Sequence, residues 1–196
     1  MAHLPLDFKQ IKVHFAACSG HKFHGPKGIG FAYVRQGTTT QPFIQGGAQE
    51  RGHRAGTENV VGIAGLGAAF NHCVDEMAAD IAHVTSVKAH AIARLTSEFP
   101  GIQFNGHSGD LQKSLYTVLN FYHPELHEGG MLNFQLDIQG VQCSGGSACS
   151  SGAVGGSHVL NGLGSPGGTR ISFSRYSTTD EVDRFIEILK GISAQN

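Results

Sequence analysis

The sequence lacks an excess of charge of either sign. Its 196 residues include 14 lysines and arginines against 15 aspartates and glutamates, which gives a formal net charge of −1 at neutral pH. Proteins that hold a nucleic-acid backbone or an anionic membrane surface carry a basic surplus. We therefore expect neither nucleic acid nor a membrane among the partners.

Long apolar runs are also absent. No stretch approaches the roughly 18 apolar residues that a membrane-spanning helix needs. The N-terminal residues show no basic segment followed by an apolar core, as a secretory signal would. The expected location is the cytoplasm.

Cysteine is sparse, and its spacing is irregular. Cys18, Cys73, Cys143 and Cys149 contain no CxxC pair, so neither a zinc site nor a disulfide framework is predicted. We expect reduced thiols and no bound metal, as in most cytosolic proteins.

What is present is a turn rich in glycine that lies between two predicted strands. Residues 19–30 contain a proline and several glycines. The segments on either side, residues 13–17 and 29–34, are short, apolar and partly β-branched or aromatic, which is typical of strands. The sheet is therefore expected to hold both ends of the turn.

The chemistry of this turn is that of a site for a phosphorylated aldehyde. Lys22 follows His21 directly, and Ser19 precedes both. A lysine amine forms a Schiff base with an aldehyde, while the serine hydroxyl and the histidine ring can donate to phosphate oxygens. Burial beside other cations would lower the lysine pKa, as such an attack requires. The alternative is a basic surface turn.

Four segments in the same order resemble the cysteine desulfurases, the NifS/IscS-like group of pyridoxal 5'-phosphate (PLP) enzymes in the class-V aminotransferase superfamily. Residues 19–28 resemble the segment of the cofactor lysine, and residues 46–59 resemble a Gly-Gly-x-x-Glu-Arg-Gly-x-Arg-x-Gly-Thr run. Residues 144–152, which include Ser-Gly-Gly-Ser-Ala-Cys, resemble the nucleophile loop, and residues 170–178 resemble the C-terminal arginine segment.

The resemblance implies an α/β fold of the fold-type I PLP-dependent transferases, but it covers only the second half of such an enzyme. Residues 1–73 would end the large PLP-binding domain, and residues 74–196 would form the small C-terminal α/β domain. The family's aspartate at the pyridine nitrogen, its glutamine and its stacking histidine have no counterpart here. The sequence is therefore expected to be a truncated desulfurase.

The same resemblance assigns the cofactor site. Lys22 would hold PLP and act as a catalytic acid and base, with Ser19 and His21 at the phosphate. Thr57 would reach the cofactor phosphate of a partner subunit, which implies a homodimer. A plainer alternative is that Thr57 only caps the following helix.

Cys149 would be the second catalytic residue. It lies in a Gly- and Ser-rich stretch, residues 143–157, whose composition predicts a mobile loop. A desulfurase thiolate attacks the substrate sulfur and then carries it away as a persulfide, which needs such mobility. The alternative is an inert cysteine in a linker. Cys143 is either a second thiol or, at a strand end, a structural residue.

The substrate carboxylate needs a cation. Arginine presents a planar fork that holds a carboxylate through two hydrogen bonds. By resemblance Arg170 binds the α-carboxylate of L-cysteine, with Arg175 as the competing candidate. An ordinary surface ion pair remains the alternative for either residue.

The function implied is conversion of L-cysteine to L-alanine, with the sulfur passed to an acceptor scaffold for iron–sulfur cluster assembly or tRNA thiolation. Two alternatives remain open. One is a selenocysteine lyase or another β-eliminating PLP enzyme. The other is a non-catalytic half-protein that serves as a dimer or docking module.

Periodicity predicts the remaining elements. Apolar spacing from Glu58 to Leu95 predicts a long helix or a broken pair, and Thr178 with Glu181 predicts a capping box that begins a final helix. The other predicted elements are strands at residues 102–104, 115–121, 141–142 and 169–173, and short helices at residues 131–138 and 156–163.

Overall fold

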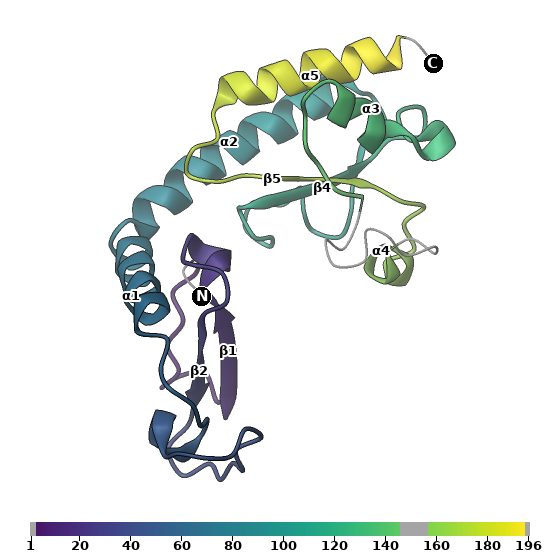
Figure 1. The fold of residues 1–196 in the computed structure, drawn as a ribbon. Helices are drawn as coiled ribbons and strands as arrows, with labels where there is room; N and C mark the ends of the chain where they lie inside the picture. The colour runs from purple at the N-terminus through teal and green to yellow at the C-terminus, as the bar shows by residue number, and fades with distance from the viewer. Residues whose placement is uncertain (1–2, 146–156, 195–196) are drawn as a thin grey trace. The chain divides into compact units, whose positions relative to one another are not determined.

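The computed structural model describes residues 3–145 and 157–194, in two compact units that divide between Ala79 and Asp80 (Figure 1). The elements of the first unit are β1 (Phe15–Ser19), η1 (Gly20–Phe23), β2 (Gly30–Val34), η2 (Gln49–Gly52) and α1 (Val60–Asp75). Helix α2 (Met77–Glu98) begins in the first unit and continues into the second. The second unit adds β3 (Gln103–Phe104), β4 (Val118–Tyr122), η3 (Glu128–Gly130), α3 (Leu132–Ile138), α4 (His158–Gly162), β5 (Thr169–Ser172) and α5 (Thr179–Ser193).

The first unit is built on the antiparallel pair of β1 and β2. Their register runs from Phe15 opposite Val34 to Ser19 opposite Gly30, so the turn that carries Lys22 joins the two strands as predicted. The strand before the turn starts two residues later than expected. Although the strand is apolar in sequence, Phe15 is 56% exposed, and the residues of the strand alternate between exposed and partly buried.

A small aromatic core fixes α1 against this hairpin. Phe23, Leu66 and Cys73 are buried. The Phe70 ring packs edge-on against Phe23 at 6.1 Å and against Phe31 at 5.9 Å between ring centroids. This core is the base on which the turn of η1 rests.

Arg35 directly follows β2 and hydrogen-bonds to the chain before β1. Its Nε donates to the Val13 carbonyl at 2.8 Å, and its Nη2 donates to the carbonyls of Phe8 at 2.7 Å and Ile11 at 2.8 Å. The Phe8 ring stacks on Tyr33 with 4.4 Å between centroids. One guanidinium therefore satisfies three carbonyls, as its fork of donors allows.

The second unit is a three-stranded antiparallel sheet with the order β3-β4-β5, and helices α2 and α5 pack together over one of its faces (Figure 1). Its core gathers residues from several elements, among them Val84, Ala91, Leu95, Leu119, Phe121, Leu136, Phe185, Ile186 and Leu189. The predicted broken pair of helices is confirmed, since α1 ends at Asp75 and α2 begins at Met77. Within the described ranges, no helix combines the length and the apolar character needed to cross a bilayer.

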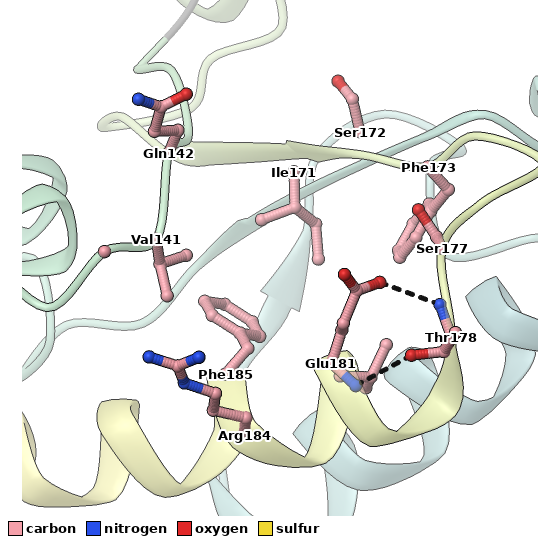
Figure 2. Close-up of a pocket in the computed structure, with 12 residues that line it drawn as sticks. Val141, Gln142, Ile171, Ser172, Phe173, Ser177, Thr178, Glu181, Arg184 and Phe185 are labelled. Carbon is pink, nitrogen blue, oxygen red and sulfur yellow. Dashed lines mark hydrogen bonds between the residues drawn. The ribbon is translucent and has the colours of Figure 1, made fainter.

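The final helix begins with the predicted capping box. The Thr178 hydroxyl accepts from the Glu181 amide at 3.2 Å, and the Glu181 carboxylate accepts from the Thr178 amide at 2.9 Å (Figure 2). Two backbone donors that a helix leaves free are thereby satisfied. Val182 and Phe185 then bury the apolar face.

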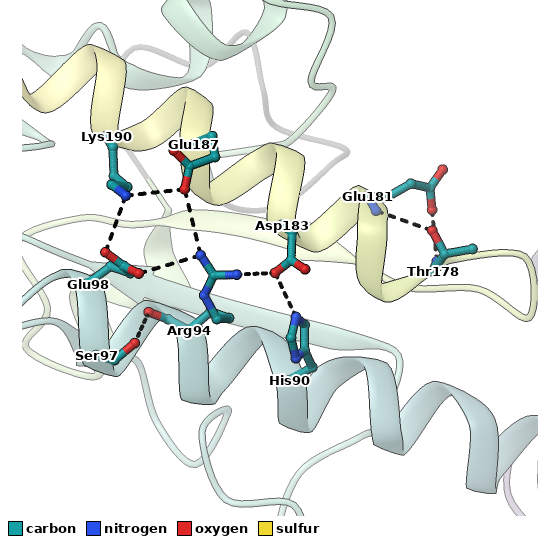
Figure 3. A network of polar contacts seen from close by, with 9 residues as sticks. All are labelled: His90, Arg94, Ser97, Glu98, Thr178, Glu181, Asp183, Glu187 and Lys190. Atoms are coloured by element: carbon teal, nitrogen blue, oxygen red, sulfur yellow. Dashed lines mark hydrogen bonds and ion pairs between the residues drawn. The ribbon is translucent and has the colours of Figure 1, made fainter.

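A row of ion pairs joins α2 to α5 along their outer side (Figure 3). Asp183 accepts from His90 at 2.7 Å and also from Arg94. Lys190 pairs with Glu98 at 3.5 Å, which links the same two helices about two turns further along α5. These groups are partly exposed, so their ion pairs should add little to the free energy of unfolding. They mainly fix how α2 and α5 lie against each other.

The strand predicted at residues 141–142 is wrong. Helix α3 ends at Ile138, and the chain turns at Gly140 with a φ of +79°. The Val141 amide closes this turn by donating to the Leu136 carbonyl at 2.9 Å, so it does not join a strand ladder. Pairing with β5 begins only at Ser144, as an isolated bridge to Arg170.

Candidate functional site

Lys22 lies on η1, directly after β1. Its neighbour Phe23 is fully buried, whereas the side chains of His21 and Lys22 are exposed. The turn closes where the Gly25 amide donates to the Gly20 carbonyl at 2.9 Å and His24 takes a left-handed conformation with a φ of +67°. The buried phenylalanine thus anchors the turn, while Lys22 is exposed, so the burial expected of the lysine is not found among the described residues.

Helix α1 lies directly against this turn. The Cys73 thiol donates to the Phe23 carbonyl at 3.5 Å. At Gly65 an added Cβ would come within 2.6 Å of the Pro26 ring, so only glycine permits so close an approach. The position of the lysine turn therefore depends on the surface of α1.

The polar groups of the turn are free to bind a ligand. In residues 3–145 and 157–194, no hydrogen bond or ion pair occupies the Ser19 hydroxyl, the His21 ring or the Lys22 amine. Ser19 precedes η1 but does not cap it with its side chain. An exposed amine on the same turn as a free hydroxyl and imidazole fits a phosphorylated aldehyde such as PLP.

Thr57 lies on the connection that leads into α1, and it is exposed. It does not cap that helix, because Asn59 does so by accepting from the Gly62 amide at 3.0 Å. The capping alternative for Thr57 is therefore wrong. Its predicted role at the phosphate of a partner subunit stays a prediction.

Arg170 lies on β5 in the second unit. It faces Asn120 across the β4–β5 ladder and exchanges backbone hydrogen bonds with Ser144 at 2.6 and 3.1 Å. Its Nε is buried and has no hydrogen-bond partner in the described part of the chain. A buried guanidinium donor of this kind is suited to an anionic ligand.

The competing candidate, Arg175, is already paired. Its Nη2 lies 2.8 Å from the Asp80 carboxylate, and the two side chains are only 13% and 19% exposed. This pair ties the segment before α5 to the beginning of the second unit. The geometry favours Arg170 for a carboxylate ligand.

The two cysteines of the predicted loop differ in what the structure describes. Cys149 lies outside the described residues. Burial raises the pKa of the Cys143 thiol to about 11, and the nearby Asp137 carboxylate adds to the effect. The Cys143 thiol also donates to the Asn133 amide oxygen at 3.3 Å. Cys143 is therefore protonated at neutral pH, as expected for a structural residue.

A cavity of about 310 Å³ opens beside the capping box of α5, between Val141, Ile171 and Phe185 (Figure 2). None of the predicted site residues that the structure describes lines it. The site residues instead belong to two groups. Ser19, His21, Lys22 and Thr57 lie in the first unit, and Arg170 lies in the second.

Two polar residues with internal hydrogen bonds were missed by sequence reasoning. Asn133 on α3 is half-buried, and its amide oxygen accepts two hydrogen bonds. Lys88 is fully buried on α2, where its ammonium donates to Ser114 and to the Leu115 carbonyl. The signal for Lys88 was its place on the apolar stripe that contains Val84 and Ala91.

Comparison with known proteins gives consistent matches. Residues 1–185 match the aminotransferase class-V family. A cysteine desulfurase IscS from Dictyoglomus turgidum is 34% identical over 197 residues, which cover 98% of this chain and 49% of that protein. A cysteine desulfurase from a Nostoc species is 38% identical over 194 residues, which cover 96% of this chain and 48% of that protein.

The fold agrees with these matches. A solved NifS-like protein aligns with a TM-score of 0.84 and 32% sequence identity, over 100% of this chain and 50% of its own. The predicted α/β fold is confirmed. The chain spans about half the length of the relatives and of the solved structure that it matches.

Proposed function

Because this chain belongs to the aminotransferase class-V family, we propose that the protein is a PLP-dependent cysteine desulfurase. The family match extends over residues 1–185, and the curated relatives named above are cysteine desulfurases at 34% and 38% identity. The observation that carries the proposal is the exposed Lys22 on a turn that the buried Phe23 anchors, with free donors beside it.

The cofactor would be held by the first unit. PLP, when bound, supplies an electron sink for the bonds at the substrate α-carbon. Lys22 would hold it through its amine and, once released, would accept and return the α-proton at Nζ. Ser19 and His21 would donate to the phosphate, and Thr57 would reach the phosphate in a second copy of the chain.

Arg170 would bind the substrate, L-cysteine. Two guanidinium N–H groups can hold the α-carboxylate in a fixed plane. The proposal is supported by the buried, unpartnered Nε of Arg170 and by the ion pair that already engages Arg175 with Asp80.

Cys149 would take the sulfur. Its thiolate attacks the sulfur of L-cysteine, so that a sulfur–sulfur bond forms as the carbon–sulfur bond breaks. The electron pair of the broken bond stays on the substrate carbon, which takes up a proton and leaves as L-alanine. Cys143 is a poor nucleophile for this step, since its pKa is about 11.

The wider setting is proposed on the resemblance to the family. The protein would act as a homodimer in the cytoplasm and would pass its persulfide to a scaffold for iron–sulfur clusters or to a tRNA-thiolation partner. Residues 1–73 would belong to the PLP-binding large domain and residues 74–196 to the small domain. The exposed Thr57 is consistent with a contact across such a dimer.

The test begins with the cofactor. The chain is incubated with PLP, reduced with borohydride and mapped by peptide mass spectrometry. We expect a stoichiometric adduct on Lys22, and none on Lys27, which is an equally exposed lysine of the same turn. The Lys22→Ala variant should lose the adduct. Labelling spread over surface lysines in both proteins would contradict a cofactor site.

Turnover of L-cysteine then distinguishes a desulfurase from the other PLP enzymes considered. With L-cysteine we expect alanine to form together with a persulfide on the Cys149 peptide, and Cys149→Ser should abolish both. Sulfide release that survives Cys149→Ser would instead indicate a β-eliminating enzyme or a selenocysteine lyase. An adduct without any turnover would leave the chain a cofactor-binding module.

A further inference from the structure

Asn133 connects two segments that the proposed reaction uses. Its amide oxygen accepts from the Thr169 hydroxyl at 2.7 Å and from the Cys143 thiol at 3.3 Å. Thr169 immediately precedes Arg170 on β5, and Cys143 begins the stretch that leads to Cys149. A single side chain of α3 therefore contacts the strand of the predicted carboxylate-binding residue and the start of the cysteine segment.

The hydrogen bonds around Asn133 have a defined direction. Thr169 is fully buried, and its single hydroxyl proton goes to Asn133. The Nε2 of His127, which lies 3.2 Å from the same hydroxyl, must then be the donor of that contact. The other ring nitrogen of His127, Nδ1, lies 3.2 Å from the His123 amide and 3.0 Å from the His123 carbonyl. Desolvation lowers the pKa of His127, which favours the neutral ring.

The amide also lies against the backbone of the cysteine segment. An added Cβ at Gly145 would come within 2.6 Å of the Asn133 Nδ2. Gly145 is four residues before Cys149 in the sequence. Between Cys143 and Gly145, the Ser144 backbone pairs with Arg170 through the isolated bridge.

The two segments depend on Asn133 to different degrees. Strand β5 is also held by four residue pairs with β4, from Val118 opposite Ser172 to Phe121 opposite Thr169. Among the described residues, 143–145 are held by the bridge at Ser144, by the contacts with Asn133 and by the packing of Cys143 against the core, and they belong to no strand ladder. Loss of the amide should therefore release the cysteine segment and leave Arg170 in place.

We propose that Asn133 is a positioning residue of the desulfurase reaction, which holds the start of the cysteine segment in register with Arg170. This proposal rests on the proposed roles of Cys149 and Arg170. It predicts a change in the rate of sulfur transfer without an equal change in substrate binding, because only one of the two segments is released.

The test compares Asn133→Ala with Gln135→Ala, a partly buried amide on the same helix. Hydrogen exchange is measured at the Ser144 and Leu119 amides of the full chain, and kcat and KM are measured for alanine formation from L-cysteine. In Asn133→Ala we expect exchange at Ser144 to be at least about tenfold faster, with Leu119 unchanged. We expect kcat to fall about 10- to 100-fold while KM stays within about threefold. Gln135→Ala should change none of these values.

Gly145→Ala tests the same contact from the other side. It adds a methyl group within 2.6 Å of the Asn133 Nδ2, so the amide must shift, and Gly145 is exposed, so the fold should tolerate it. We expect the same loss of kcat and the same faster exchange at Ser144. If Asn133→Ala does not fold, the results for Gly145→Ala test the positioning role of Asn133.

The outcomes separate this proposal from the proposed function. Unchanged exchange at Ser144 in both variants would overturn the positioning role, as would a rise in KM that matches the fall in kcat. If the unmodified protein forms no alanine but acquires faster exchange at Ser144 on substitution, the desulfurase function fails while Asn133 is still shown to hold the segment.

Discussion

At the scale of single residues, the surroundings of Cys143 determine its reactivity. Cys143 is half-buried beside Asp137, and these surroundings raise its pKa to about 11. A thiolate is the reactive form of cysteine, so a thiol that stays protonated can pack and donate but cannot attack. The structure therefore removes Cys143 from the candidates for the sulfur-accepting nucleophile.

Alkylation rates test this assignment. At pH 8 a thiol of pKa 11 is about one part in a thousand ionised, so we expect iodoacetamide to modify Cys143 about 100-fold more slowly in the folded protein than in urea. The rate should still rise about tenfold per pH unit between pH 8 and 10. Peptide mass spectrometry gives both rates. A plateau near pH 9 would contradict the raised pKa.

Lys88 gives a second test at this scale. Burial lowers its pKa below the ordinary value of 10.5, and the Asp110 carboxylate opposes the shift only in part. Between the lowered value and 10.5 the unfolded chain binds more protons than the folded one, so stability rises with pH in that window. We expect the unfolding free energy of the unmodified protein, relative to Lys88→Met, to increase as the pH approaches 10.5.

Lys190 is the matched control for this experiment. The hydrogen bond that the Lys190 ammonium donates to the Glu187 carboxylate raises the pKa of Lys190, so its contribution to stability is lost as the pH rises above the ordinary value. The difference between the unmodified protein and Lys190→Met should therefore decrease at alkaline pH. Curves of the same slope for both variants, measured by urea unfolding, would refute the argument for Lys88.

At the scale of elements, α1 determines where the lysine turn lies. The helix has three glycines on its first turns, but they face different surroundings. A Cβ at Gly65 would meet the Pro26 ring at 2.6 Å, whereas a Cβ at Gly67 would meet nothing within 4 Å. The close approach of α1 to the turn therefore depends on one of these glycines.

Alanine substitutions compare the two positions. Alanine in a helix is favoured over glycine by up to about 1 kcal/mol, so Gly67→Ala should stabilise the protein by roughly 0.5–1 kcal/mol. At Gly65 the clash with Pro26 should cost about 1–3 kcal/mol and reverse the sign. The Lys22 adduct should also form more slowly in Gly65→Ala. Urea unfolding measures the stabilities, and equal gains at both positions would disprove the contact.

Much of the element pattern could be predicted from the sequence because it depends on local signals. The hairpin around Lys22 followed from glycine and proline, and α5 followed from its capping box. Residues 141–142 were predicted to form a strand, yet the Val141 amide donates within the turn after α3. Asn133 could not be found this way, since its partners lie 10 and 36 residues away in the sequence.

At the scale of the whole molecule, the described residues form two cores of unequal size. The core of the second unit contains 18 buried residues, and that of the first contains three. Stability comes mainly from buried apolar surface, so the two units should differ in their resistance to unfolding. The unit that carries Lys22 is the one with the smaller core.

Hydrogen exchange in increasing urea tests this difference. We expect the amides of β2 in the first unit to lose protection at a lower urea concentration than those of β4 in the second. Leu66→Ala should lower the first transition and leave the second in place, because Leu66 belongs to the smaller core. A single transition for all amides would show instead that the units unfold together.

The three hydrogen bonds of the Arg35 guanidinium also constrain the lysine turn. The Arg35 side chain donates to the carbonyl of Phe8, which lies 27 residues earlier, so the chain between them forms a closed ring. Lys22 lies near the middle of this stretch of sequence. Closing a ring removes conformational freedom from every residue inside it, and the loss grows only slowly with its length. The lysine turn is thus already ordered before any ligand arrives. Since an arginine keeps its charge throughout the physiological pH range, acid or base should not open the ring.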